Sequence, residues 1–209
     1  MRIVAISDTH GRHQQVQLPK GDILLHAGDV SGRGTEVEIL DFLNWFSIQD
    51  FEHKIFIPGN HDFYFEQVTP AAIQAILPPN ILCLNDSGVT IDGINIWGSP
   101  ITPWFYNWAF NRHRGQAIQK HWDLIPKNTD VLITHGPPKG ILDTIVSGDE
   151  VGCERLVDAL KIVKPKFHIF GHIHEARGIL KKKHTTYINA SVVNLQYQVV
   201  HAPVVFDWE

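Results

Sequence analysis

The feature of this sequence that most constrains its fold is a set of polar clusters, each placed directly after a short apolar run. The apolar runs have the length and composition of buried β-strands, and they cover residues 2–7, 23–27, 54–57, 131–134 and 167–170. The clusters that follow them are Asp8-Thr9-His10, Gly28-Asp29, Gly59-Asn60-His61-Asp62, His135-Gly136 and Gly171-His172-Ile173-His174. Open α/β sheets collect their ligands at the carboxyl ends of the strands. We therefore expect these clusters to meet at one edge of the fold.

Amphipathic segments separate the strands, and this alternation predicts a layered α/β fold. Thr35 and Glu38 form a capping-box pattern ahead of one helix, and Thr69-Pro70 begins a second. A third helix is predicted over residues 153–163. Asp92-Gly93 lies between alternating apolar residues, which predicts a hairpin. Further strands are predicted at residues 81–84, 89–91, 94–97, 185–189, 199–201 and 204–206.

The composition is that of an ordinary globular protein, with 44% hydrophobic and 19% charged residues. No repeat or linker interrupts the chain, so we expect a single domain over residues 1–209. The net charge is -4 and the largest basic block is Lys181-Lys182-Lys183, which argues against binding of extended nucleic acid. The apolar run at the N-terminus is too short for a signal peptide, and no long apolar run follows it. With Cys83 and Cys153 as packing residues of a reduced compartment, we expect a cytoplasmic protein that does not enter a membrane.

The residue types in the clusters point to a metal centre. An aspartate after a strand is usually a turn residue, and a lone histidine is usually packed in the core. If these residues had only such structural roles, every cluster would lie at a strand end by coincidence, and its charged groups would be left unpaired at one edge of the sheet. The set contains Asp, Asn and His but no Cys, which suits Mn, Fe or Zn ions. There are too many ligands for one ion, so we predict a dinuclear metal centre.

A dinuclear centre predicts a particular class of reaction. Two ions about 3.5–4 Å apart stabilise both the attacking and the leaving oxygen of an in-line displacement. Metal coordination brings the pKa of water down to about 7, so a metal-bridging hydroxide is the expected nucleophile. Hydrolysis of a phosphate ester fits this chemistry.

The spacing of the clusters resembles that of the calcineurin-like metallophosphoesterases along nearly the whole chain. Three finer motifs are Ser7-Asp8-Thr9-His10, His135-Gly136-Pro137-Pro138 and Tyr187-Ile188-Asn189-Ala190-Ser191. They are similar to the branch that contains the vertebrate metallophosphoesterase-domain brain proteins and their bacterial relatives, close to the class III cyclic-nucleotide phosphodiesterases. The resemblance implies a four-layer α/β/β/α sandwich, in which two mixed β-sheets are flanked by helices.

The resemblance also implies a role for each residue of the clusters. Asp29 would bridge two metal ions, of which the first is held by Asp8, His10 and His174 and the second by Asn60, His135 and His172. His61 would donate a proton to the leaving group or stabilise the phosphorane, and Asp62 would orient it. Some brain relatives carry glycine at the position of His172, which weakens their second metal site. The histidine here implies a competent enzyme.

The segment from residue 99 to 112 is rich in aromatic residues and carries two prolines, so we expect a loop. Its aromatic side chains either pack as a cap over the core or stack on a base or aromatic leaving group of the substrate. The candidate substrate-binding residues are Trp104, Phe105, Trp108 and Arg112. His26 is expected to pack or to support the metal ligands without binding metal, and Asn189 to support the site.

The predicted function is hydrolysis of phosphodiester or phosphomonoester bonds in a small nucleotide. The alternative is a weakly active, nucleotide-binding regulatory protein on the same fold. The presence of both His61 and His172 favours catalysis. The expected partner is a small phosphate ester, and a homodimer is compatible with the sequence.

Overall fold

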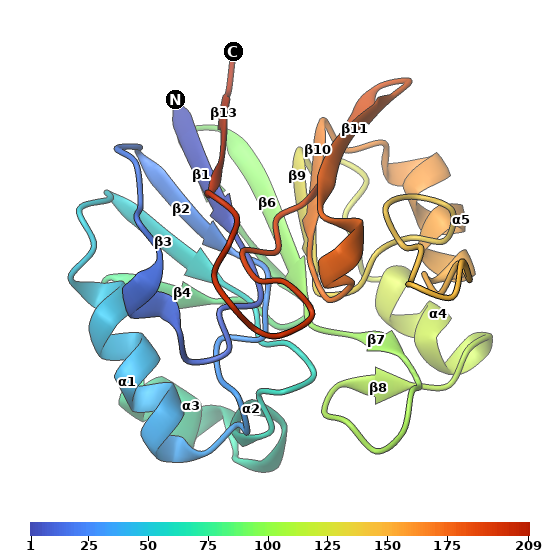
Figure 1. Ribbon diagram of the computed structural model, residues 1–209. Helices are drawn as coiled ribbons and strands as arrows, with labels where there is room; N and C mark the ends of the chain where they lie inside the picture. The colour runs from blue at the N-terminus through green and yellow to red at the C-terminus, as the bar shows by residue number, and fades with distance from the viewer.

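Two mixed β-sheets lie face to face between helices in the computed structural model, which describes residues 1–209 (Figure 1). Sheet one has the strand order β13-β1-β2-β3-β4. Its strands are β1 (Arg2–Ile6), β2 (Ile23–His26), β3 (His53–Phe56), β4 (Ile81–Cys83) and β13 (Val204–Asp207). Strands β1 to β4 are parallel, and β13 pairs with β1 in the antiparallel sense.

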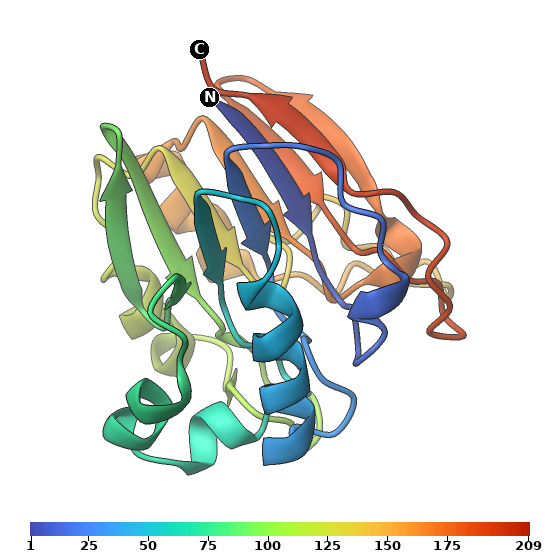
Figure 2. The ribbon, with the colours of Figure 1, turned by 90° about the vertical axis from the view of Figure 1, so that its left-hand side faces the viewer.

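Sheet two has the strand order β11-β12-β10-β9-β6-β5. Its strands are β5 (Ser87–Ile91), β6 (Ile94–Ser99), β9 (Val131–Thr134), β10 (Phe167–Phe170), β11 (Gly178–Lys182) and β12 (Thr185–Asn189). The four inner strands are parallel, and the edge strands β5 and β11 are antiparallel to their neighbours. Strands β1, β2, β6 and β9 all point away from the end of the molecule where the two termini lie (Figure 2). The carboxyl ends of both sheets therefore share one edge.

Alternating residues of β1 show how the layers form. Ile3 and Ala5 face sheet two and belong to the core between the sheets, with Ile133 of β9. Val4 and Ile6 face outward into the core that contains the helices. The helices are α1 (Glu36–Ser47), α2 (Tyr64–Gln67), α3 (Pro70–Ile76), α4 (Gln116–Trp122) and α5 (Glu154–Val163). Helices α1 and α3 lie beside sheet one, and α4 and α5 beside sheet two (Figure 1), which confirms the predicted four-layer sandwich.

The predicted helix starts are confirmed by their capping contacts. The Thr35 side chain accepts a hydrogen bond from the backbone N–H of Glu38, and the Glu38 carboxylate accepts one of 3.0 Å from the Thr35 backbone. Thr69 caps α3, with Pro70 in the first turn. Helix α5 ends at Val163 and is followed by the capping residue Lys164, which has a φ of 51°.

Some predicted elements are wrong or were missed. The predicted strand at 199–201 is absent, because Val199 forms only an isolated bridge to Val193 and Val200 is 53% exposed. Helix α4 was missed because only Ile118 and Trp122 of it are buried, which leaves too little periodicity to detect. The predicted loop at 99–112 contains two short strands that pair with each other, β7 (Thr102–Pro103) and β8 (Asn111–Arg112). Two single 3-10 turns, η1 (His13–Gln15) and η2 (His174–Ala176), complete the fold.

Both cysteines are free, as expected for packing residues. No helix of the structure has both the length and the apolar character needed to cross a membrane.

Candidate metal centre

The predicted clusters come together at the edge where the parallel strands of both sheets end. Sheet one contributes the loops after β1, β2 and β3, and sheet two contributes the loops after β9 and β10. The sheets are joined here because Ser7, after β1, bridges to Ser191 and accepts a 3.1 Å backbone hydrogen bond from Val192. The backbone N–H of His172 also donates to the Asp8 carboxylate at 3.0 Å, across 164 residues of sequence. Residues distant in sequence thus form one site.

Sharp turns at the strand ends direct the side chains of the predicted ligands into this edge. The predicted ligands with a left-handed backbone are Asp8 (φ 59°), His10 (φ 44°), Asp29 (φ 55°) and His172 (φ 68°). Such a conformation costs a residue with a side chain on the order of 1–3 kcal/mol and concentrates at functional sites. Gly171 meets a related constraint, since a Cβ atom there would overlap the Asp8 carboxylate. The strain indicates that side-chain placement at this edge outweighs local backbone preference.

One group of three side chains gathers beside β1. The ligand atoms of Asp8, His10 and His174 all lie within 4.8 Å of one another. The Nε2 atoms of His10 and His174 are 3.3 Å apart, and His174 Nε2 is 3.7 Å from the Asp8 carboxylate. Burial opposes ionisation of Asp8, but the hydrogen bond and charge of His174 hold its pKa below the ordinary value. Burial lowers the pKa of His10 to about 4, so this imidazole is neutral and available to a metal ion at neutral pH.

A second group gathers beside β9. The ligand atoms of Asp29, His135 and His172 lie within 4.8 Å of one another. His135 Nδ1 donates to the Ala27 carbonyl at 2.9 Å, so its Nε2 carries a lone pair when the ring is neutral. That atom faces two oxygens, Asn60 Oδ1 at 2.9 Å and Asp29 Oδ2 at 3.3 Å.

Three lone pairs that converge in a buried place require a cation between them. A proton is one such cation: burial disfavours the charged ring, but the Asp29 carboxylate outweighs it and raises the pKa of His135 to about 9. A metal ion is the other. The donated Nδ1–H to a backbone carbonyl is the usual support of a metal-binding histidine. The residues present therefore fit a divalent ion.

Asp29 lies between the two groups. Its Oδ2 atom is 3.6 Å from His10 Nε2 and 3.3 Å from His135 Nε2. Its Oδ1 atom accepts a 2.8 Å hydrogen bond from the backbone N–H of His61. Despite burial, the charge of His135 and its hydrogen bond to the carboxylate lower the pKa of Asp29 well below its ordinary value. A permanently ionised carboxylate that touches both groups is suited to bridging two cations.

His61 lies at the border of the centre. Its Nδ1 atom donates to the Gly32 carbonyl at 2.8 Å, and a ring nitrogen lies within 4.8 Å of ligand atoms of His10 and Asp29. Trp108 stacks on the imidazole, with ring centroids 4.3 Å apart. The ring is thus held in place beside the predicted metal ligands.

The prediction that Asp62 orients the His61 ring is wrong, because the carboxylate forms no hydrogen bond or ion pair with that ring. It accepts hydrogen bonds from the backbone N–H groups of Val30 (3.1 Å), Ser31 (2.9 Å) and Gly59 (2.7 Å), and from the Ser31 hydroxyl (2.6 Å). Burial, with the nearby charge of Asp29, raises the pKa of Asp62 to about 6. Asp62 joins the loop after β2 to the loop after β3.

Only two of the four predicted substrate-binding residues line a cavity beside the centre. Trp104 and Phe105 line a cavity of about 550 Å³ that also contacts His172. Trp108 does not line this cavity, because its indole lies on His61. Arg112 does not line it either, since its guanidinium pairs with Glu66 at 2.9 Å.

Other residues of the neighbourhood carry no motif or only a weak one. Tyr197 lies against His10 and His174, with ring centroids 4.7 and 5.5 Å apart, and was missed because it follows no strand. His26 Nε2 is 2.9 Å from the Thr9 hydroxyl, so it supports the first turn of the site. Asn189 donates to the Ile173 carbonyl at 2.8 Å and holds the loop after β10.

Comparisons with known proteins agree with this geometry. The model of the family Calcineurin-like phosphoesterase matches residues 1–176. Metallophosphoesterase domain-containing protein 1 of Homo sapiens is 42% identical over 99% of this chain and 70% of its own length. UPF0046 protein K07C11.7 of Caenorhabditis elegans is 36% identical over 99% of this chain and 74% of its own.

Among solved structures, phosphopantetheinyl hydrolase from Mycobacterium tuberculosis is similar to this chain with a TM-score of 0.62 and 16% sequence identity. The match covers 93% of this chain and 90% of that chain. At that identity the likeness concerns the fold alone. The relatives confirm the branch indicated by the motifs around Asp8 and His135. The chain belongs to the calcineurin-like phosphoesterases, a family of metal-dependent hydrolases.

Proposed function

We propose that this chain hydrolyses phosphodiester or phosphomonoester bonds of small nucleotides with two divalent metal ions. The observation that carries the proposal is the position of Asp29, whose Oδ2 atom lies 3.6 Å from His10 and 3.3 Å from His135. A carboxylate shared by two groups of ligands is the arrangement that a dinuclear centre needs. The rest of the site is consistent with it.

The proposed ligands fall into two sets that share Asp29. The first set is Asp8, His10 and His174, and the second is Asn60, His135 and His172. Two bound divalent ions would supply a water nucleophile that ionises near neutral pH and positive charge for an in-line displacement. Oxygen and imidazole ligands suit Mn, Fe or Zn.

The side chain that would assist departure of the leaving group is His61. Its Nδ1–H is committed to the Gly32 carbonyl, so Nε2 is the atom free to act on substrate. A protonated Nε2 donates a hydrogen bond to a phosphoryl oxygen or a proton to the departing alkoxide. Trp108 on one face of the ring limits its rotation. We assign His61 to the leaving group and not to a metal ion.

The cavity beside His172 supports a nucleotide as substrate. Its volume of about 550 Å³ lies in the range of small-ligand sites, about 300–1,000 Å³. Trp104 and Phe105 are 49% and 46% exposed, so their rings are accessible to a base. The net charge of -4 disfavours a long nucleic acid, whose binding needs many basic contacts.

Metal reconstitution tests the proposal. The protein is stripped with a chelator and titrated with Mn²⁺, Fe²⁺ or Zn²⁺, while bound metal and turnover are measured together. The substrates are bis(nitrophenyl) phosphate, nitrophenyl phosphate, a nucleoside monophosphate and a cyclic nucleotide. We expect turnover to rise until two equivalents are bound. Tight nucleotide binding with no turnover above background at any metal loading would instead favour the regulatory alternative.

A further inference from the structure

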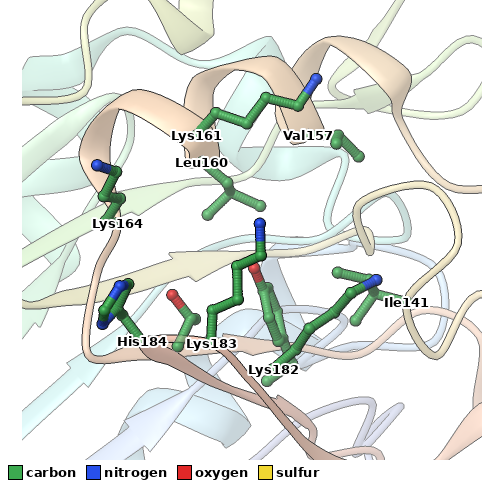
Figure 3. A pocket seen from close by; sticks show the side chains of 10 residues that line it. Ile141, Val157, Leu160, Lys161, Lys164, Lys182, Lys183 and His184 are labelled. Atoms are coloured by element: carbon green, nitrogen blue, oxygen red, sulfur yellow. The ribbon is translucent and has the colours of Figure 1, made fainter.

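A second cavity lies at the opposite end of sheet two from the metal centre. It has a volume of about 380 Å³ and lies between the end of α5 and the hairpin of β11 and β12 (Figure 3). Strand β12 begins at Thr185, which lines this cavity. It ends at Asn189, which holds the loop after β10 at the candidate metal centre. The two sites are thus separated by the length of a strand and share no residue.

The cavity combines an apolar floor with a basic rim. The floor consists of Ile141, Val157, Leu160 and Tyr187. The rim carries Lys161, Lys164, Lys182, Lys183 and His184. Lys183 extends into the space between Leu160 and Ile141, and Lys182 lies beside it (Figure 3). No carboxylate lines the cavity.

Most of this positive charge is unbalanced. Lys161 pairs with Asp158 at 2.8 Å, but Lys164, Lys182 and Lys183 form no ion pair. The chain as a whole is acidic, with 18 basic and 22 acidic residues, so a concentration of unpaired lysines in one hollow is not a consequence of composition. Neighbouring ammonium groups repel one another, and a bound anion would remove that repulsion.

The backbone conformation at Lys183 is unfavourable for a residue that carries a side chain. Lys182 pairs with Thr185, so Lys183 and His184 form a two-residue hairpin turn. Lys183 takes the first turn position with a φ of 55°, a conformation for which glycine is ordinarily preferred. A lysine at this position carries a conformational cost that glycine would avoid, so the geometry of the turn does not by itself explain the side chain.

We propose that this cavity binds a small organic phosphate, with its phosphate on Lys182 and Lys183 and its apolar or aromatic part on the floor formed by Leu160 and Tyr187. The volume suits one small molecule, since such sites measure about 300–1,000 Å³. An inorganic anion would leave the apolar floor uncovered. The site is independent of the metal centre and of the reaction proposed for it.

Residue-resolved NMR tests the site in the metal-loaded protein. The probe is phenylphosphonate, whose P–C bond is not a phosphoester and is not cleaved, and the metal is diamagnetic Zn²⁺. We expect saturable shifts of the amide signals of Lys182, Lys183, Thr185 and Leu160, with any shifts near His172 forming a separate set. The absence of shifts around the cavity would overturn the proposal. Equal affinity for neutral benzyl alcohol would overturn it too, because the lysines would then play no part.

Charge variants give a matched comparison. The double variant Lys182→Glu, Lys183→Glu should raise the Kd for phenylphosphonate at the cavity at least 10-fold. The control Lys120→Glu, Lys127→Glu changes net charge equally at exposed lysines outside the cavity and should leave that Kd unchanged. Equal losses in both variants would show a general charge effect and overturn the site.

The variant Lys183→Gly separates binding from structure. Glycine fits a φ of 55°, so the melting temperature should stay the same or rise while cavity binding weakens at least 5-fold. A fall in melting temperature with unchanged binding would make Lys183 a structural residue and contradict the proposal. Binding of phosphatidylserine vesicles with no response to phenylphosphonate would assign the lysines to a membrane surface instead, and would also overturn it.

Discussion

The indole of Trp108 lies nearly parallel to the imidazole of His61, with ring centroids 4.3 Å apart and an interplanar angle of 28°. Phe63 packs against the same indole, with centroids 5.8 Å apart. Together with the Gly32 carbonyl, which accepts from His61 Nδ1 at 2.8 Å, this contact fixes the orientation of the imidazole. An aromatic residue that the sequence suggested as a substrate contact therefore acts on a neighbouring side chain.

Replacing Trp108 by alanine should lower kcat about 10- to 100-fold, a part of the roughly 10²–10⁴-fold effect of general acid catalysis, because His61 loses its fixed orientation. KM should change little, and Trp108→Phe should restore much of the rate. Steady-state kinetics on a substrate with a poor leaving group measures the effect. A variant that raises KM alone would return Trp108 to the substrate-binding residues.

The variant His61→Ala tests whether this side chain binds metal. Its ring lies within reach of ligand atoms of His10 and Asp29, so position alone does not decide. We expect both metal ions to remain and the rate to fall roughly 10²–10⁴-fold, less for a nitrophenolate leaving group that needs no proton. Metal content and rate are measured on the same sample. Loss of one metal equivalent would reassign His61 as a ligand.

The variant His172→Gly should lose the second metal ion and most of the activity while it keeps its fold. Glycine tolerates the φ of 68° at this position, so the backbone has no reason to rearrange. Bound metal should fall from two equivalents to one at low metal concentration, as elemental analysis would show. Full turnover by the one-metal protein would mean that the second site is not catalytic.

Alanine at Trp104 or Phe105 should raise KM for nucleotide substrates about 5- to 150-fold, because a base stacked on an aromatic ring contributes about 1–3 kcal/mol. Both rings line the cavity beside His172. A small phenyl phosphate should be affected much less, which makes it the internal control. If both substrates suffer equally, these rings serve the fold of the loop and not recognition of the base.

His168 should make stability depend on pH. The Thr134 hydroxyl donates to the Gly136 carbonyl at 2.7 Å, so it must accept from His168 Nε2–H at 2.8 Å, and the buried Nδ1 has no partner for a second proton. Burial lowers the pKa of His168 from 6.5 to about 3. Between these values the unfolded chain binds the additional proton, so the free energy of unfolding falls as pH drops, by up to about 1.4 kcal/mol per pH unit.

The variant His168→Gln keeps a donor to Thr134 but cannot titrate. Its free energy of unfolding should therefore fall less steeply between about pH 5.5 and about pH 4 than that of the parent protein. Urea denaturation at several pH values measures the difference, in which the other histidines cancel. Identical slopes would show that folding does not lower the pKa of His168.

The sequence by itself determined the strand ends and the residues that follow them. Apolar runs such as residues 2–7 reveal buried strands through local composition, and the polar residues directly after them, such as Asp8 and Asp29, must lie at the carboxyl edge of the sheet. A residue that directly follows a strand lies at the C-terminal end of that strand, and this position is a local property of the sequence. For that reason the residues now grouped in the candidate metal centre could be named before the fold was known.

The tertiary structure decided what depends on contacts between segments that share no local pattern. Asp62 holds two loops together instead of the neighbouring imidazole, and Trp108 contacts His61 instead of the cavity. Tyr197 reaches His10 from a loop with no strand before it. Each depends on where a loop folds back in space, which is set by packing against other loops and not by the residues beside it in the chain.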